Sequence, residues 1–142
     1  MQRIILSGCL IINERKELLL LFRDKHNHYE TPGGKVEDKD CQGNCELDDL
    51  ENTALRELKE EIGDVKVEFI EYFGKVEFEI PDGRLAIANK FIVKISGTPK
   101  IMEKHFSKLD WLPILKLQDY PLSPDLKLFR QRIQIELLAK HL

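Results

Sequence analysis

The sequence predicts a mixed α/β fold in which a β-sheet packs against helices. Two observations support this class: apolar, strand-like segments occur in groups along the chain, and segments with helical periodicity follow two of these groups. No internal repeat and no Gly- or Pro-rich linker interrupts the order. The length is that of one ordinary domain, so we expect a single domain over residues 1–142.

The first two strands are expected to form a hairpin. Residues 2–13 and 17–23 are apolar, and a short polar segment separates them. Residues 24–31 are expected to be a loop, and Pro32-Gly33-Gly34 breaks regular structure. The polar stretch 35–46 then predicts a long loop.

The middle of the chain predicts a helix followed by a second hairpin. In residues 47–62 the apolar side chains recur on one broad face, and Gly63 stands at the expected C-cap. Residues 65–80 and 84–96 alternate loosely between apolar and polar, with Pro81-Asp82-Gly83 between them as a strong turn signal.

The C-terminal part predicts a short strand and a final helix. The strand is expected at 109–112, around Trp111. Ser123 as N-cap and Pro124 at the first helical position mark the start of the helix. Its apolar side chains are Leu126, Leu128, Phe129, Ile133, Leu137 and Leu138.

Composition and charge argue against several classes of partner. The formal charge of −3 provides no broad basic field for a nucleic-acid polymer or an anionic membrane. The longest apolar run, residues 18–22, is far shorter than the ~20 residues of a membrane-spanning helix. No convincing signal-peptide cleavage site follows the first apolar segment. We therefore expect a soluble, cytoplasmic protein.

The cysteines and histidines carry weak signals. Three cysteines, an odd number, do not make a disulfide framework. Cys41 and Cys45 have the spacing of half a metal-binding clip, but no second ligand pair follows, and two ordinary loop thiols are the alternative. No metal-binding spacing relates the four histidines, to which we assign no function: His26, His28, His105 and His141.

The most informative segment is a cluster of carboxylates in the 47–62 helix. Glu57, Glu60 and Glu61 project within an arc of roughly 100°, because they are spaced i, i+3 and i+4. Their mutual repulsion calls for a cation, and Mg²⁺ prefers carboxylate oxygens. Arg56 projects near Glu60 and can orient a carboxylate. The alternative is an exposed acidic helix stabilised by i,i+4 ion pairs.

Two stretches together resemble the Nudix box, G-x5-E-x7-R-E-U-x-E-E-x-G-U with U aliphatic. They read Pro32-Gly33-Gly34-Lys35-Val36-Glu37 and Arg56-Glu57-Leu58-Lys59-Glu60-Glu61-Ile62-Gly63. The rest of the chain resembles the MutT-like layout. Eight extra residues separate Gly34 from Arg56, which suggests an insertion at about 39–46. Counting back from Arg56 places Asp48 at the first glutamate of the box, and Asp64 stands at an aliphatic position.

The resemblance implies a Nudix-type α/β/α sandwich with a mixed β-sheet between helices. It also implies Mg²⁺-dependent hydrolysis of a diphosphate bond, with Mn²⁺ as the second option for the metal. The expected substrate is a small nucleotide: a nucleoside triphosphate, normal or oxidised, converted to the monophosphate and pyrophosphate. ADP-ribose or a nucleotide sugar is the alternative substrate, and a non-catalytic nucleotide-binding module is the alternative class. We expect a monomer or a homodimer.

The same resemblance assigns roles to individual residues. Glu57, Glu60 and Glu61 are the expected metal ligands, together with the backbone carbonyl of Gly33. The expected general base is Glu60 or Glu103, and for Glu103 an ordinary surface glutamate is the alternative. Arg56 is expected to support the catalytic carboxylates.

Four further residues are candidates for substrate binding. Arg23 suits a phosphate group, with a solvated strand-end arginine as the alternative. Tyr29 can stack on a base or cap the core. Asp125 can read the edge of a nucleobase, although a helix start also explains it. Lys35, in the glycine loop, completes the set.

Overall fold

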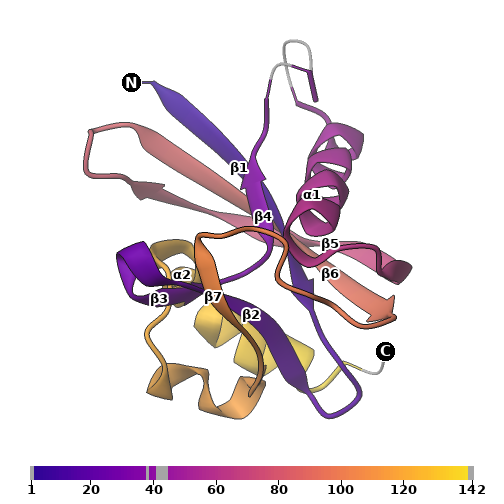
Figure 1. The fold of residues 1–142 in the computed structure, drawn as a ribbon. Coiled ribbons are helices and arrows are strands. Elements are labelled where there is room, and N and C mark those ends of the chain that lie inside the picture. The colour runs from indigo at the N-terminus through magenta and orange to yellow at the C-terminus, as the bar shows by residue number, and fades with distance from the viewer. Residues whose placement is uncertain (1, 38, 41–44, 141–142) are drawn as a thin grey trace.

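The computed structural model describes residues 2–37, 39–40 and 45–140, which form two β-sheets flanked by helices (Figure 1). The sheets have the strand orders β4-β1-β6-β5 and β3-β2-β7. Strands β1 and β6 are parallel and the other pairs are antiparallel, so the predicted mixed sheet is confirmed. The strands are β1 (Arg3–Ile11), β2 (Glu17–Arg23), β3 (His28–Glu30), β4 (Gly33–Lys35), β5 (Lys66–Glu79), β6 (Leu85–Ser96) and β7 (Phe106–Pro113).

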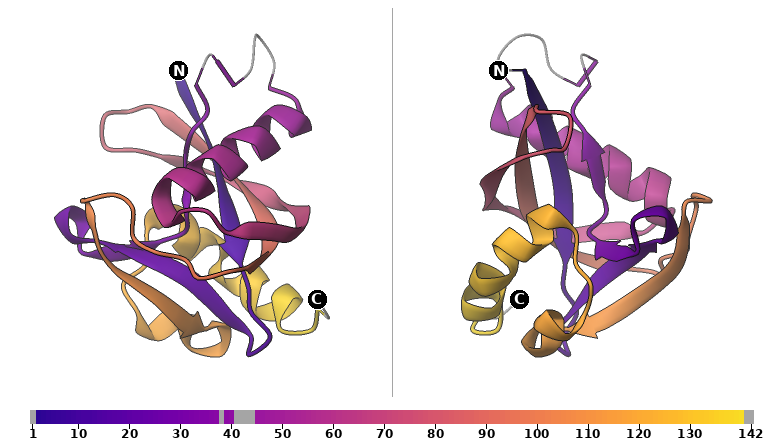
Figure 2. Two further views of the ribbon diagram at one scale, coloured as in Figure 1. Left: turned by 45° about the vertical axis from the view of Figure 1, so that its right-hand side comes forward. Right: turned by 90° about the vertical axis from the view of Figure 1, so that its left-hand side faces the viewer.

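The two main helices lie on opposite sides of the strands, which makes an α/β/α sandwich (Figure 2). Helix α1 packs on β1, β4 and β6, and helix α2 packs on β5. The helical elements are α1 (Leu47–Ile62), α2 (Pro124–Arg132), the 3₁₀ turns η1 (Asp24–His26) and η2 (Ile114–Asp119), and a π-helical turn η3 (Ile133–Leu137). None of the helices in the described parts of the chain is long and apolar enough to span a membrane.

The continuous apolar runs of β1 and β2 are explained by burial on both faces. Alternate side chains, such as Leu10 and Leu20, join the core around α2. Their neighbours, such as Ile11 and Leu19, join the core around α1. Because successive side chains of a strand point to opposite faces, a strand between two helical layers is apolar throughout.

The predicted hairpin between the first two strands is confined to its turn, where the N–H of Asn13 donates to the carbonyl of Glu17 at 3.2 Å, and the two strands do not pair along their length. Strand β1 pairs with β4 and β6, whereas β2 pairs with β3 and β7, and a bridge between Ile12 and Leu18 lies where the two strands diverge. Long apolar strands can bury themselves against any partner, so adjacency in the sequence did not determine the pairing. The loop expected at 24–31 contains the short strand β3, and the glycines expected to break regular structure begin the short strand β4.

The remaining elements largely follow the predictions. Helix α1 has the predicted bounds and ends at Gly63, where φ is +89°. The hairpin of β5 and β6 is confirmed, and β7 is longer than expected. Pro124 opens α2 as predicted, but the Ser123 hydroxyl donates to Asp125 (2.7 Å) and does not cap the helix backbone. The final helix gives way to the π-helical turn after Arg132.

Candidate functional site

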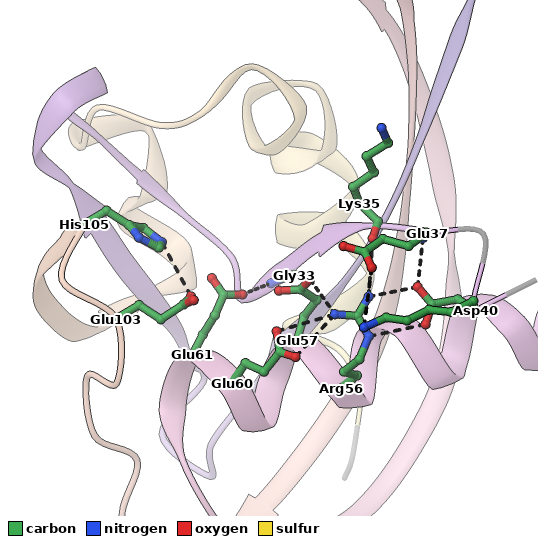
Figure 3. A network of polar contacts seen from close by, with 11 residues as sticks. Gly33, Lys35, Glu37, Asp40, Arg56, Glu57, Glu60, Glu61, Glu103 and His105 are labelled. Atoms are coloured by element: carbon green, nitrogen blue, oxygen red, sulfur yellow. Dashed lines mark hydrogen bonds and ion pairs between the residues drawn. The ribbon is translucent and has the colours of Figure 1, made fainter.

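The candidate site forms where α1 passes beside the short strand β4. The backbone N–H of Gly33 donates to Glu61 Oε1 at 2.7 Å (Figure 3). Residues Gly33 and Gly34 pair with Gly8 and Ser7 of β1. The glycine strand is therefore fixed between β1 on one side and the carboxylates of α1 on the other.

At both glycines a Cβ would come too close to a neighbouring group, but the two neighbours differ. A Cβ at Gly33 would lie 2.6 Å from the Cα of Gly8 and 2.8 Å from the carbonyl oxygen of Ser7, both in backbone. A Cβ at Gly34 would overlap the carboxylate of Glu57. The first glycine thus permits two strands to approach, and the second leaves room for a carboxylate.

This difference predicts opposite effects for two alanine substitutions. In Gly34→Ala the methyl group meets the mobile end of a side chain, so thermal stability should stay near that of the parent. The displaced Glu57 carboxylate should weaken divalent-metal binding by about tenfold or more, the scale seen when an oriented ligand is disturbed. Gly33→Ala, in which the methyl group meets backbone, should instead lower the melting temperature. Metal titration and thermal denaturation check both, and unchanged metal binding in Gly34→Ala would contradict the placement of Glu57.

Glu61 is a carboxylate in an unusually dry environment, with an exposed fraction of 2%. Burial raises the pKa of its carboxyl group to about 9. The hydrogen bond from Gly33 acts against this rise, whereas the charges of Glu57 and Glu103 add to it. An ionised Glu61 therefore needs a nearby cation for compensation.

Glu57 and Glu60 share a cation within the protein. Arg56 Nη1 lies 3.1 Å from Glu57 Oε1 and 3.4 Å from Glu60 Oε2. Burial raises the pKa of the Glu57 carboxyl, and Arg56 offsets part of that rise. Glu60 is the most open of the three carboxylates, with a side chain that is 48% exposed. The guanidinium group thus holds two neighbouring carboxylates on one face of α1.

The strongest partner of Arg56 is Asp40, which the sequence analysis did not identify. Arg56 Nη2 donates to Asp40 Oδ2 at 2.8 Å, and this contact keeps the pKa of the Asp40 carboxyl below its usual range. Counting forward from Gly34, Asp40 stands at the first glutamate of the box, whereas Asp48 is exposed in the first turn of α1. The residue at the first-glutamate position of the box is therefore Asp40 and not Asp48. The insertion, expected at about 39–46, then begins after Asp40. Cys41, which was weighed with Cys45 as half of a metal-binding clip, lies outside the described residues.

A second group of ligand atoms approaches from the segment before β7. One ligand atom each from Glu61, Glu103 and His105 lies within 4.8 Å of the others. Glu103 thus lies beside the helix carboxylates, as its candidate role requires. His105 was assigned no function from the sequence because its spacing matches no metal motif.

A pocket of about 330 Å³ adjoins these carboxylates. Gly33 and Gly34 line it, so the pocket and the carboxylates share the glycine strand. At its wall Lys90 Nζ lies 2.7 Å from Asp125 Oδ2 and 2.6 Å from Thr31 Oγ1, and Lys90 is only 5% exposed. Burial alone would raise the pKa of Asp125, but Lys90 and hydrogen bonds outweigh it and lower the pKa.

The other substrate candidates lie in different surroundings. Arg23 lines the pocket, but its guanidinium group is paired with Glu30 at 2.6 and 2.9 Å. Tyr29 is 7% exposed in the core and donates to Asp110 at 2.7 Å, so the structure favours the core-capping alternative. Lys35 is exposed, and its ammonium group points away from the carboxylates (Figure 3).

Lys90 was missed although the sequence carries a signal for it. Residues 88–93 form an otherwise largely apolar strand, and a lysine inside such a run must pair with something. The partner, Asp125, lies at the start of α2, and only the folded structure brings the two together. Asp40 and His105 lie in irregular segments, where periodicity provides no guide.

The comparisons with known proteins place the chain in the class of pyrophosphohydrolases. A family model described as the NUDIX domain matches residues 3–133, and the chain therefore belongs to the Nudix family. Nudix hydrolases generally use divalent metal ions. The set of carboxylates around the buried Glu61 fits such an ion, because divalent cations take carboxylate oxygens and the neighbouring charges of Glu57 and Glu103 are negative.

Solved structures agree with this assignment. The MutT protein from Methanosarcina mazei Go1 is similar with a TM-score of 0.75 and 25% identity, covering 96% of both chains. The MutT NUDIX hydrolase from Burkholderia pseudomallei has a TM-score of 0.73 and 22% identity, covering 92% of this chain and 98% of that one. The NUDIX domain of Shewanella oneidensis NrtR, complexed with ADP ribose, has a TM-score of 0.67 and 20% identity, covering 95% and 88%. No curated protein sequence matches the chain.

Proposed function

We propose that this Nudix hydrolase converts a nucleoside triphosphate, normal or oxidised, to the monophosphate and pyrophosphate. One observation carries the proposal: the carboxylates of α1 and the pocket meet at Gly33 and Gly34. A ligand seated in the pocket can therefore present its phosphates to metal ions beside the carboxylates.

The metal ions would be held by three helix carboxylates and one backbone group. Glu57, Glu60 and Glu61 supply the oxygens, and the carbonyl of Gly33 adds a ligand from β4. When bound, Mg²⁺, or Mn²⁺ in its place, neutralises the diphosphate and lowers the pKa of an attacking water. Arg56 keeps Glu57 and Glu60 in place through its contacts with both.

A glutamate would accept the proton of the attacking water. Glu60 is the more open carboxylate on the helix, and Glu103 lies across the site next to Glu61. Glu60 is itself a proposed metal ligand and Glu103 lies beside one, so both are close to where the attacking water would be bound and both are candidates for the general base. No covalent intermediate with the protein is needed, because the water attacks phosphorus directly.

The pocket would recognise the part of the substrate that carries no phosphate. Asp125 is kept ionised by Lys90 and presents acceptor oxygens, which suit the N–H groups of a nucleobase. Arg23, at the pocket wall, is the proposed phosphate-binding cation. A phosphate group would have to compete with Glu30 for its guanidinium group.

A panel of normal and oxidised nucleoside triphosphates, ADP-ribose and nucleotide sugars, each with Mg²⁺, tests the proposal. We expect release of pyrophosphate and a monophosphate from at least one triphosphate. Turnover of ADP-ribose or of a nucleotide sugar alone would contradict the proposed triphosphate substrate but would still identify the protein as a diphosphate hydrolase. Tight nucleotide binding with no hydrolysis of any compound would instead identify a non-catalytic module.

A further inference from the structure

His105 lies next to Glu103, at the Glu61 end of the helix carboxylates and away from Arg56 (Figure 3). Its segment is tied to the end of α1, because the N–H of Met102 donates to the carbonyl of Glu61 at 3.1 Å. The imidazole packs against Phe106, with 4.3 Å between ring centroids. The backbone and a ring contact thus hold His105 beside a buried carboxylate.

We propose that His105 is a nitrogen ligand to a divalent cation that Glu61 and Glu103 also bind. The site then takes a transition metal such as Mn²⁺, Fe²⁺, Co²⁺ or Zn²⁺ more tightly than an all-oxygen site would, relative to Mg²⁺. This inference rests on the metal-dependent function proposed above, and it adds a ligand and a metal preference to it.

The geometry of the three side chains suits a shared ion. Metal–ligand bonds of about 2.0–2.2 Å place donor atoms roughly 3–4.5 Å apart around one ion, and the three candidate atoms lie within 4.8 Å of one another. Glu61 is fixed by Gly33, whereas the side chains of Glu103 and His105 are 35% and 40% exposed. Small rotations of these two side chains would therefore bring their ligand atoms to bonding distance of one ion beside Glu61.

A role for His105 as a simple hydrogen-bond partner fits less well. Its Nε2 lies 3.5 Å from Glu103 Oε1, which is long for a hydrogen bond. One ligand atom from each of the two side chains also lies within 4.8 Å of a carboxylate oxygen of Glu61. Imidazole nitrogen favours Mn²⁺ and the later transition metals over Mg²⁺, which prefers oxygen ligands and keeps its water.

Pulsed electron paramagnetic resonance of the substrate-free protein loaded with Mn²⁺ tests the ligand directly. We expect ¹⁴N modulation from a coordinated imidazole, lost in His105→Gln and kept in the matched control His26→Gln. Bound Mn²⁺ without ¹⁴N modulation, or modulation that survives in His105→Gln, would overturn the inference. Circular dichroism of each variant verifies that the fold is retained.

Calorimetric titrations of the same proteins test the metal preference. In His105→Gln the affinity for Mn²⁺ and Co²⁺ should fall by at least about tenfold, since disturbing even an indirect support of a ligand costs about 10- to 100-fold. The affinity for Mg²⁺ should change far less, and equal losses for all three ions would refute the preference. The two proposals fail separately: Mn²⁺ bound without nitrogen leaves the carboxylate site intact, whereas no metal binding at all removes the proposed function as well.

Discussion

Replacing Glu60 by glutamine is expected to abolish most turnover and to leave the fold unchanged. The side chain is 48% exposed and its contact with Arg56 is long, at 3.4 Å, so little stability depends on it. An amide, however, neither carries the charge that binds a metal ion nor accepts a proton. We expect kcat to fall by about 10²- to 10⁴-fold, the range of a lost general base.

The measurement is the initial rate of pyrophosphate release from the best substrate of the panel, alongside a thermal melt. Glu14→Gln makes the same chemical change at an exposed turn between β1 and β2 and serves as the control. Full activity in Glu60→Gln would show that the helix carboxylates are not the reaction centre.

The second large effect is expected in metal-free protein, where Glu61→Gln should be more stable than the parent at pH 8. Burial raises the pKa of Glu61 from 4.5 to about 9, so the folded protein resists its ionisation. The contribution of the neutral, buried carboxyl to the free energy of unfolding is fully present below pH 4.5 and is lost as pH rises towards 9. In that window Glu61 lowers the free energy of unfolding by at most about 1.4 kcal/mol per pH unit. Glutamine carries no charge and removes this dependence.

Denaturant unfolding with EDTA between pH 5 and pH 9 measures the difference in slope between the two proteins. Adding Mg²⁺ or Mn²⁺ at pH 8 should stabilise the parent, because the ion binds the folded state, and should stabilise the variant much less. Parallel pH profiles for the parent and Glu61→Gln would contradict the buried state of this carboxylate.

Local patterns made helix α1 and its carboxylates predictable from the sequence. Helical phase alone placed Glu57, Glu60 and Glu61 on one side of α1, because i, i+3 and i+4 spacing is independent of the rest of the fold. The bounds of α1 and the β5–β6 hairpin followed from similarly local signals, namely Gly63 and the turn after β5.

Contacts between distant segments could not be predicted in this way. The pairing of β1 with β6 depends on how two apolar strands are buried, and their sequences do not encode a partner. The contact between Lys90 and Asp125 joins β6 to α2, and Asp40 reaches Arg56 across the insertion. These groups meet only after the sheets and helices have assembled.

The buried pair at the pocket wall has a consequence for how substrate preference can change. The carboxylates belong to α1, whereas Lys90 and Asp125 belong to β6 and α2. Under the proposed function, the groups that would recognise the substrate can therefore change while those that would hydrolyse it stay the same. Removing either member alone leaves an uncompensated buried charge, which costs about 3–5 kcal/mol. At this pair, a change of specificity would therefore need paired substitutions, and single-site libraries at Lys90 or Asp125 would sample mainly destabilised proteins.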